Sequence, residues 1–492
     1  VPGFIIVKNL DTSGKPWRSY HSAIGNNHYL RLNETDPKAQ HENTWNQTNP
    51  TSTHFTVGTE SDVNKQNEEH IAYIFADGSD ADSAVFGTDG DEKIIKCGTY
   101  TGTSGTEEIN VGFEPQWILI KRVNSGSDNW VVYDVMREWQ AYADSHALHP
   151  NSNAVEYTGA GLIHPTTTGF KAISNDGIFG GNGDTYAYVA IRRPHKPPTT
   201  GTDVFQMDVN TSSEPEYVSN FVVDWAFHRN LPYSDNFDSY TRLTGAARLE
   251  LNNTTAEASN SGGKFEFMDG WGDNLANNNI YNSWMFRRAP GFMDVVTYIG
   301  TGTTANIPHS LGVAPEMIWV KQRNGTEHWA VYYVGAGSNR YMHLNLNQQS
   351  YVDSAFWANT TPTASQFTVG WKNHTNQQSY KYLAIAFASL PGISKIGTYT
   401  GTGNAGNNVD CGFTNGARFV MVKKTTGSGD WWFADTLRGI NAGNDPFLAL
   451  NSTNNENNTV DWIDAYSAGF TINGAGGDYN NSGSSYLFFA IA

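Results

Sequence analysis

Two tryptophans lie in polar segments of this sequence, where an aromatic ring could contact a ligand. Trp271 follows Asp269 within the Gly- and Asp-containing segment 268–274, and Trp139 lies in an insertion within a repeating pattern. Tryptophan faces stack well on pyranose rings, and lectin-like sandwiches use them in this way. Trp271, Asp269 and Trp139 are therefore the candidate ligand-binding residues, with carbohydrate as the expected ligand.

Acidic residues are concentrated in the segment 77–92. Asp80, Asp82, Asp89 and Asp91 offer the hard carboxylate oxygens that calcium requires. Their spacing is not that of an EF-hand loop, and acidic linkers are usually just solvated. We expect no obligatory cofactor, and calcium is the one metal ion that this segment suggests.

Two Asp-x-x-Arg pairs, Asp134–Arg137 and Asp435–Arg438, could position a substrate or could pin a turn through a local salt bridge. Other copies of the repeat lack the pair, which favours the turn. The 14 histidines are scattered without metal-ligand spacing, and no G-x-S-x-G, Walker or H-E-x-x-H motif occurs. The sequence gives no positive signal for catalysis, so we expect a protein that is not an enzyme.

These residues are carried by a pattern that recurs about every 100 residues. An apolar strand ending in a basic residue spans 4–8, 117–121, 317–321 and 419–423, and the divergent third repeat has Phe221–Asp224 there. An aromatic residue follows eight or nine positions later in each repeat, namely Trp17, Trp130, Tyr233, Trp329 and the pair Trp431-Trp432. A Leu-x-Leu-Asn strand, such as 30–33 or 344–347, a Phe-centred strand and a closing aromatic-aliphatic strand complete the unit.

Period-2 alternation between Gly-, Asn-, Ser- and Thr-rich loops predicts an all-β protein. We expect five tandem antiparallel β-sandwich modules, jelly-roll or lectin-like, of about 100 residues each. Their expected bounds are 1–77 for repeat one, 78–93 for an acidic linker, 94–194 for repeat two, 195–291 for repeat three, 292–391 for repeat four and 392–492 for repeat five.

Several finer expectations follow from the same pattern. The near-continuous apolar runs predict central strands, one in each sheet of a sandwich, and the only helical candidate is 133–146. Short proline-containing connections predict a semi-rigid string of sandwiches. Repeat one begins directly at its basic strand, so we expect that an N-terminal segment is missing or that another chain supplies the opening strand.

Composition and charge restrict the partners. The net charge of −17 and pI near 5.2 argue against nucleic acid, because phosphate neutralisation needs clustered Lys and Arg. No apolar stretch approaches the ~20 residues that a membrane span needs, so we expect no membrane insertion. The two cysteines, Cys97 and Cys411, fall at different points of their repeats, so we expect no disulfide between them.

The most regular repeats share a specific set of motifs. These are Lys-x-Gly-Thr-Tyr-Thr-Gly at 96–102 and 395–401, the segment Gly112–Arg122, Trp-x-x-x-Asp-x-x-Arg at 130–137 and the closing strand 186–191. Together they resemble a tandem module of tail-fibre and other virion proteins of marine tailed bacteriophages, cyanophages included. The resemblance covers nearly the whole chain and is strongest in repeats two, four and five.

The resemblance implies an extracellular, virion-attached fibre or spike, oligomeric and usually trimeric, that adheres to the host surface. It carries no catalytic residues over to this chain. We therefore expect a non-enzymatic adhesin that assembles with other virion proteins and binds a host cell-surface glycan or protein, with weak sites multiplied by avidity. Two alternatives remain, a purely structural fibre shaft or capsid decoration protein, and a secreted bacterial glycan-binding protein or polysaccharide depolymerase.

Aromatic residues that every repeat carries are most simply core residues. Recognition is then expected where the repeats differ, around Trp139, around Trp271, and on the surfaces between neighbouring modules.

Overall fold

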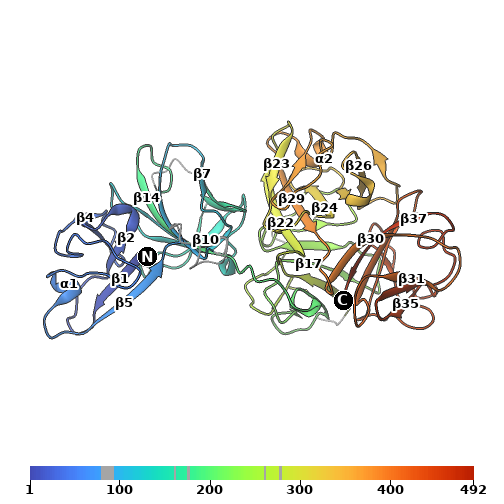
Figure 1. Ribbon diagram of the computed structural model, residues 1–492, viewed down its shortest axis with the longest axis horizontal. Helices are drawn as coiled ribbons and strands as arrows, with labels where there is room; N and C mark the ends of the chain where they lie inside the picture. Colours follow the sequence, from blue (N-terminus) through green and yellow to red (C-terminus); the bar gives the residue numbers. More distant parts are fainter. Residues whose placement is uncertain (79–92, 160–161, 174–177, 260–261, 276–279) are drawn as a thin grey trace. The chain divides into compact units, whose positions relative to one another are not determined.

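The computed structural model describes residues 1–78, 93–159, 162–173, 178–259, 262–275 and 280–492. These residues form a nearly all-β protein of antiparallel strands, as the sequence predicts, with only the one-turn helices α1 (Ser61–Asn64) and α2 (Asn373–Asn376) and short 3-10 turns among them. The chain divides into two compact units, Val1–Pro194 and His195–Ala492 (Figure 1). We describe each unit by itself.

In the first unit, repeat one forms a sheet in the order β4-β3-β2-β1-β5, from β1 (Pro2–Asn9), β2 (Arg18–His21), β3 (His28–Arg31), β4 (Ala39–Gln40) and β5 (His70–Ala76). Repeat two has a main sheet in the order β6-β14-β8-β9, from β6 (Ile95–Thr101), β8 (Pro115–Arg122), β9 (Val131–Asp134) and β14 (Thr185–Arg192). Its second sheet has the order β12-β13-β7, from β7 (Glu107–Asn110), β12 (Ile163–Thr166) and β13 (Gly169–Ala172), and β10 (Ser145–Ala147) pairs with β11 (Tyr157–Gly159).

In the second unit, repeat three has the sheet β15-β21-β17-β18-β19, from β15 (Phe205–Val209), β17 (Trp225–Asn230), β18 (Asp238–Thr241), β19 (Leu249–Glu250) and β21 (Tyr281–Phe286), and β16 (Tyr217–Val218) pairs with β20 (Gly270–Trp271). Repeat four has the sheet β22-β29-β24-β25-β26-β27, from β22 (Met293–Ile299), β24 (Met317–Gln322), β25 (Ala330–Tyr333), β26 (Arg340–His343), β27 (Tyr351–Val352) and β29 (Lys381–Phe387), and β23 (Ala305–Pro308) pairs with β28 (Gln366–Val369).

Repeat five has the sheet β30-β37-β32-β33-β34, from β30 (Ser394–Thr400), β32 (Phe419–Lys424), β33 (Trp431–Asp435), β34 (Leu448–Ala449) and β37 (Ser485–Ile491). Its second sheet has the order β31-β36-β35, from β31 (Asn407–Asp410), β35 (Ile463–Tyr466) and β36 (Gly469–Ile472). Only repeats two and five thus have a three-stranded second sheet among the described residues. The count of five complete sandwiches therefore stays a prediction.

The basic strand and the closing strand lie side by side in one sheet, as β24 and β29 do in repeat four. The expectation of one central strand in each sheet was wrong. Both strands read as near-continuous apolar runs because both faces of this sheet are covered. In repeat four, Ile318 and Ala384 belong to the core of the repeat itself, whereas Trp319 and Ile385 belong to a core shared between repeats.

The helix expected at 133–146 does not form. The Asp134 carboxylate accepts hydrogen bonds from the backbone N–H groups of Met136 and Arg137, and this cap supports a single 3-10 turn. Glu138 then adopts a left-handed conformation with φ of 55°, which ends the turn. Strands β9 and β10 therefore flank a capped turn where the sequence suggested a helix.

Strand pairing corrects the alignment of repeat three. In repeat three, Trp225 of β17 pairs with Phe286 of the closing strand, and in repeat four Met317 of β24 pairs with Phe387 in the same way. Strand β17 is therefore the basic strand of repeat three. Arg229 occupies the position that Lys321 has in repeat four. The predicted strand 221–224 precedes β17. The apolar run Phe221–Val223 resembles a strand locally, but its side chains pack into the core of repeat three from outside the ladder.

The aromatic residue expected eight or nine positions after the basic strand is also corrected in repeat three. The backbone N–H of Phe237 donates to Asn252 Oδ1 at 2.9 Å, and the backbone N–H of Trp329 donates to Asn345 Oδ1 at 3.2 Å. Phe237 therefore takes this place, and Tyr233 is 63% exposed. The same contact shows that the Leu-x-Leu-Asn element of repeat four ends at Asn345 instead of Asn347.

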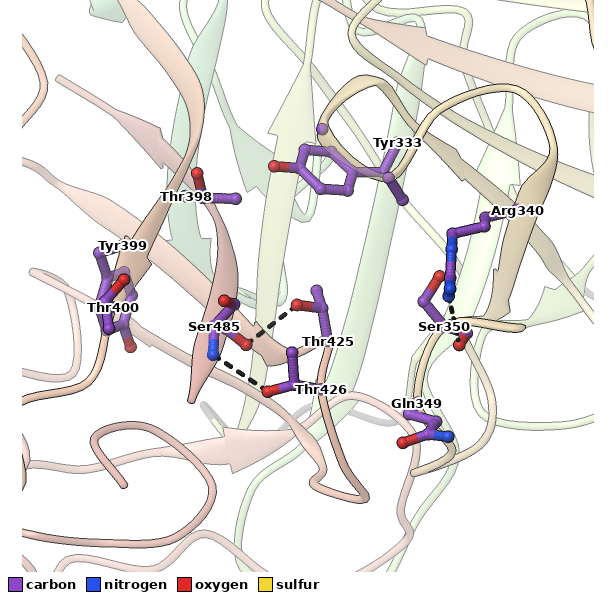
Figure 2. Close-up of a pocket in the computed structure, with 12 residues that line it drawn as sticks. Tyr333, Arg340, Gln349, Ser350, Thr398, Tyr399, Thr400, Thr425, Thr426 and Ser485 are labelled. Atoms are coloured by element: carbon purple, nitrogen blue, oxygen red, sulfur yellow. Dashed lines mark hydrogen bonds between the residues drawn. The ribbon is translucent and has the colours of Figure 1, made fainter. Parts of the chain in front are cut away.

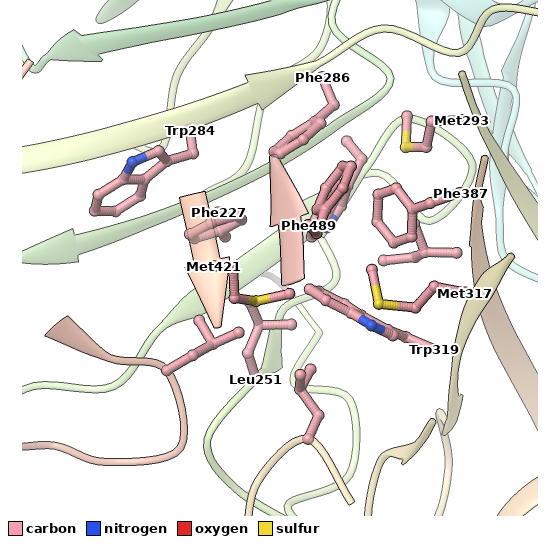
Figure 3. Packing of buried hydrophobic residues seen from close by; sticks show 14 of the residues in the cluster. Phe227, Leu251, Trp284, Phe286, Met293, Met317, Trp319, Phe387, Met421 and Phe489 are labelled. Carbon is pink, nitrogen blue, oxygen red and sulfur yellow. The ribbon is translucent and has the colours of Figure 1, made fainter. Parts of the chain in front are cut away.

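Repeats three, four and five share one apolar core, so they are not a string of separate sandwiches. Aromatic residues of the three main sheets meet there (Figure 3). Trp225 lies 5.8 Å from Trp319 between ring centroids, and Trp284 lies 5.2 Å from Phe433. In the first unit, repeats one and two share a smaller core, in which Phe4 lies 6.3 Å from Trp130.

We call the contact between two repeats a seam. In each of three seams, the tryptophan that follows the basic strand donates its indole N–H to a backbone carbonyl oxygen of the preceding repeat. The three pairs are Trp130 to Arg31 O at 2.8 Å, Trp329 to Glu250 O at 2.9 Å and Trp431 to His343 O at 3.0 Å. The basic residue adds to the seam, because Lys121 donates to Thr35 O at 2.7 Å and Lys321 to Thr254 O at 3.1 Å.

A further seam joins repeat three to repeat five. Arg229 donates to the carbonyl oxygens of Thr453, at 2.7 Å, and Asn454. The indole N–H of Trp284 donates to Asp435 Oδ2 at 2.9 Å. The three repeats of the second unit therefore form a closed ring around their shared core.

Candidate functional site

The two candidate tryptophans are buried. Trp271 stacks on Tyr217 at 5.3 Å and donates its indole N–H to Ser283 Oγ at 2.9 Å. Trp139 stacks on Tyr133 at 6.0 Å and donates to Ile163 O at 2.9 Å. Neither indole presents a face on which a sugar ring could stack, so both act as core residues in this structure.

The remaining candidates do not join these tryptophans in a site. Asp269 is exposed, and its backbone carbonyl accepts hydrogen bonds from Ser219 N and Asn220 N. The acidic candidates Asp80, Asp82, Asp89 and Asp91 all lie outside the described residues. Within the described ranges, no group of three or more His, Cys, Asp or Glu side chains is arranged to hold a metal ion.

Both Asp-x-x-Arg pairs form local ion pairs, as expected. Arg137 contacts Asp134, and Arg438 contacts Asp435 at 2.7 Å. Each aspartate also accepts a backbone N–H three residues later, which pins the turn. The two cysteines are both buried and free, so no disulfide links them.

A concave site lies at the seam between repeats four and five. A hollow of about 730 Å³ is formed there (Figure 2). Repeat four lines it with Tyr333, Gly335, Ala336, Arg340, Gln349 and Ser350. Repeat five lines it with Thr398, Tyr399, Thr400, Thr425, Thr426 and Ser485. We call this hollow the seam groove.

Strand ends and one edge strand position these side chains. Tyr333 ends β25 and Arg340 begins β26, with a 3-10 turn between them. Thr398 and Thr400 point outward from β30, which is the edge strand of the main sheet of repeat five. Alternation along β30 therefore brings two hydroxyl groups to the same side of the groove.

Backbone hydrogen bonds hold the floor of the groove. Ser350 N donates to Thr425 O at 3.3 Å across the seam, and Thr425 N donates to Ser485 O at 2.9 Å. Ser485 N in turn donates to Thr426 Oγ1 at 3.0 Å (Figure 2). Residues of both repeats are thereby fixed relative to one another before any ligand arrives.

Two polar groups in the groove, those of Arg340 and Tyr333, have geometry suited to a ligand, whereas that of Ser350 is closed to one. The Arg340 guanidinium is half-buried and donates to Ser350 O at 3.1 Å, which orients it. The Ser350 hydroxyl is buried and has no hydrogen-bond partner in the described part of the chain. Burial raises the pKa of Tyr333, and a hydrogen bond with the Thr398 side chain opposes this rise. The phenol is therefore a neutral donor at physiological pH.

The lining carries hydroxyl groups, an amide and one guanidinium, but no carboxylate, histidine or cysteine. Binding a polyhydroxylated molecule needs donors and acceptors of the kind found here. The arrangement therefore suits recognition of a polar ligand.

Sequence reasoning pointed to surfaces between modules without naming these residues. The groove combines strand ends of repeat four with an edge strand of repeat five. No local spacing marks such a combination, although Arg340 and Gln349 have no counterpart in a regular motif.

Comparison with known proteins identifies a family whose function is unknown. The chain matches a family model described as a domain of unknown function, DUF7483, over residues 1–194 and 210–492, and so belongs to that family. No curated protein and no solved structure matches it. In the described part of the chain, no helix is long and apolar enough to cross a membrane.

Proposed function

We propose that this member of a family of unknown function is a non-enzymatic attachment protein of a bacteriophage particle that binds host-surface glycan in the seam groove. The observation that carries the glycan part is the groove itself. Its two outward hydroxyls on β30 and the oriented guanidinium of Arg340 are complementary to sugar hydroxyls.

The particle part of the proposal rests on the resemblance of the repeats to virion modules. The tandem architecture supports it further, because several weak sites on one assembly bind a cell surface with high avidity. The net charge of −17 is compatible with glycan and not with nucleic acid as the partner.

A glycan array and a host-cell binding assay with the full chain test the proposal. The variant Thr400→Val removes one groove hydroxyl while keeping a β-branched residue on the strand. We expect binding to weaken about tenfold, because loss of one hydrogen bond with an unpaired partner costs about 1–2 kcal/mol. Thr101→Val is the matched control, since Thr101 has the same place on β6 outside the groove.

Equal loss of binding in both variants, or none in either, would remove the groove from the proposal. Release of reducing ends from host polysaccharide by the wild-type chain would instead indicate a depolymerase.

A purely structural role is the second candidate function. The closed ring of repeats three to five favours it, because one continuous core makes a rigid body that needs no ligand. A chain that assembles into particles but binds neither glycans nor host cells would support this second candidate.

A further inference from the structure

Repeat five fills one place in its core with four aromatic rings. The Trp432 indole stacks on the Phe447 ring, with 3.9 Å between the ring centroids. Trp462 and Tyr479 lie 5.6 Å and 5.0 Å from the same indole. The three rings around Trp432 are all buried. The fold of this module can therefore hold an indole at this place.

Repeat two has smaller side chains at the equivalent places. Val131 corresponds to Trp432, because each pairs with the residue before the buried lysine of the basic strand. Ala147 corresponds to Phe447, because each precedes a leucine that pairs with the residue after Val131 or Trp432. An indole and a phenyl ring in repeat five are thus replaced in repeat two by an isopropyl and a methyl group.

Two further places agree with this correspondence. Leu162 stands where repeat five has Trp462, because the carbonyl oxygen of each accepts the N–H of the residue after the Phe-centred strand, at 2.8 Å and 2.9 Å. Phe179 stands where repeat five has Tyr479, because the carbonyl oxygen of each accepts a hydrogen bond from the tyrosine hydroxyl of the opening strand, β6 or β30. Of the four aromatic rings in repeat five, repeat two keeps only that of Phe179.

A pocket of about 300 Å³ lies at this place in repeat two, and all four of the exchanged residues line it. Tyr133 also lines it and, being larger than Ala434 at the equivalent place of repeat five, takes up part of the space. Tyr157 and Ile178 complete the apolar lining, and they are 50% and 41% exposed. Solvent therefore reaches the apolar part of the pocket.

Polar side chains line the rest of the pocket, Asp128 and His149 among them. The Asp128 carboxylate forms an ion pair with Arg122. His149 Nδ1 lies 3.1 Å from the backbone carbonyl oxygen of Trp130. Because a carbonyl oxygen can only accept, Nδ1 carries the proton, and Nε2 of the neutral imidazole is an acceptor. A ligand that donates an N–H or O–H group therefore finds acceptors among the residues that line the pocket.

We propose that this pocket binds a planar aromatic ring of about indole size that carries a hydrogen-bond donor. Repeat five indicates the size, because Trp432 of the same chain occupies the equivalent place. Aromatic rings bury a large apolar area, and an indole N–H or a phenol O–H usually finds a partner when it is buried. The pocket offers both, and its volume suits a single ring or a small ligand. This inference is independent of glycan binding, because the seam groove lies in the second unit.

Such a ring can come from a free small molecule or from a tryptophan side chain of a partner protein, and saturation-transfer NMR titrations of the full chain distinguish the two. Indole is the probe for the ring alone, and N-acetyl-tryptophanamide is the probe for a tryptophan within a polypeptide. We expect indole to bind with a dissociation constant of about 1 mM or lower. Equal or tighter binding of the amide would identify a protein side chain as the natural occupant, and weaker binding of the amide would identify a small molecule.

Scanning calorimetry of the wild-type chain places the site without any substitution. A ligand that binds only the folded state raises the unfolding temperature of the unit that holds it. Indole at about ten times its dissociation constant should therefore raise the transition of residues 1–194 and leave that of residues 195–492 in place. An effect on the second unit alone would overturn the assignment to repeat two.

Two substitutions refill the pocket with rings that repeat five carries. Ala147→Phe and Leu162→Trp should each weaken indole binding at least about tenfold. Ala465→Phe, at an exposed position of β35, is the matched control. An unmoved transition of residues 1–194 shows that a variant is folded. Absence of indole binding to the wild-type chain at millimolar concentration would overturn the proposal, as would folded variants that bind indole as the wild type does.

Discussion

Replacing Lys321 by methionine should destabilise the second unit through the loss of one buried ammonium group. Lys321 is fully buried, and its Nζ donates to Thr254 O at 3.1 Å, Gly325 O at 3.2 Å and Glu327 O at 2.8 Å. The first of these contacts crosses from repeat four to repeat three. Methionine fills a similar volume but offers no donor to the three carbonyl oxygens.

Two opposing contributions set the magnitude. Hydrogen bonds to a charged group contribute about 1.5–3 kcal/mol each, so loss of three costs at least about 5 kcal/mol. Burial lowers the pKa of Lys321 from 10.5 to about 8, and at about 1.4 kcal/mol for each pH unit the charged form carries a penalty of about 3 kcal/mol that the variant avoids. The net loss expected for Lys321→Met is therefore at least about 2 kcal/mol.

The pH dependence has a definite sign. The folded-state pKa lies below the unfolded one, so between pH 8 and 10.5 the unfolded chain binds more protons at this lysine. The contribution of Lys321 to stability therefore rises with pH across this window. The free energy of unfolding of Lys321→Met should therefore rise less with pH in this window than that of the wild-type chain.

Differential scanning calorimetry of the full chain measures the effect. We expect the transition of the unit 195–492 to fall by at least roughly 4 °C, because about 1 kcal/mol shifts the melting temperature of a large domain by roughly 2–3 °C. The transition of the unit 1–194 should not move. Lys196→Met, at an exposed lysine of the same unit, serves as the control. A Lys321→Met chain as stable as this control would refute the reasoning about the buried seam.

Three further outcomes are expected. Gly335→Ala should weaken glycan binding in the seam groove and lower the free energy of unfolding by about 1–3 kcal/mol, because a Cβ at Gly335 would lie 1.9 Å from the Tyr333 hydroxyl oxygen. Unchanged binding on the glycan array and an unchanged melting temperature would contradict this. Burial and the neighbouring His374 and His328 lower the pKa of His343 to about 3, so stability should fall as pH drops below 6.5, by about 2 kcal/mol at pH 5. Urea unfolding of His343→Gln should show a shallower acid dependence than wild type. Burial raises the thiol pKa of Cys97 and Cys411, so a thiol reagent should label neither cysteine before unfolding; rapid labelling of native chain would count against their placement.

Local sequence determined the β class and most strand positions. Alternation along a strand and the identity of strand-forming residues are local properties, and they marked the closing strands β14, β29 and β37 directly. The same local reading identified the Asp-x-x-Arg turns, because a carboxylate and a guanidinium three residues apart interact without help from distant segments.

Alignment of the divergent repeat required strand pairing. Repeat three carries Arg229 and Phe237 where other repeats carry a lysine and a tryptophan. The local pattern therefore predicted Asp224 and Tyr233 for these two positions. Only the pairing of Trp225 with Phe286 shows which residues occupy equivalent places. Pairing depends on hydrogen bonds between segments about 60 residues apart, which the local pattern does not contain.

Tertiary structure alone decided which aromatic residues could contact a ligand. Trp271 and Trp139 lie in polar segments, yet residues distant in sequence cover both indoles and accept their N–H groups. The seam groove arises in the opposite way, from strand ends and an edge strand of two repeats that only the shared core brings together. The sequence by itself determined that this protein is made of repeated β modules. The closure of repeats three to five into a ring depends on which faces meet, because burial is a property of the packed assembly and not of the strand.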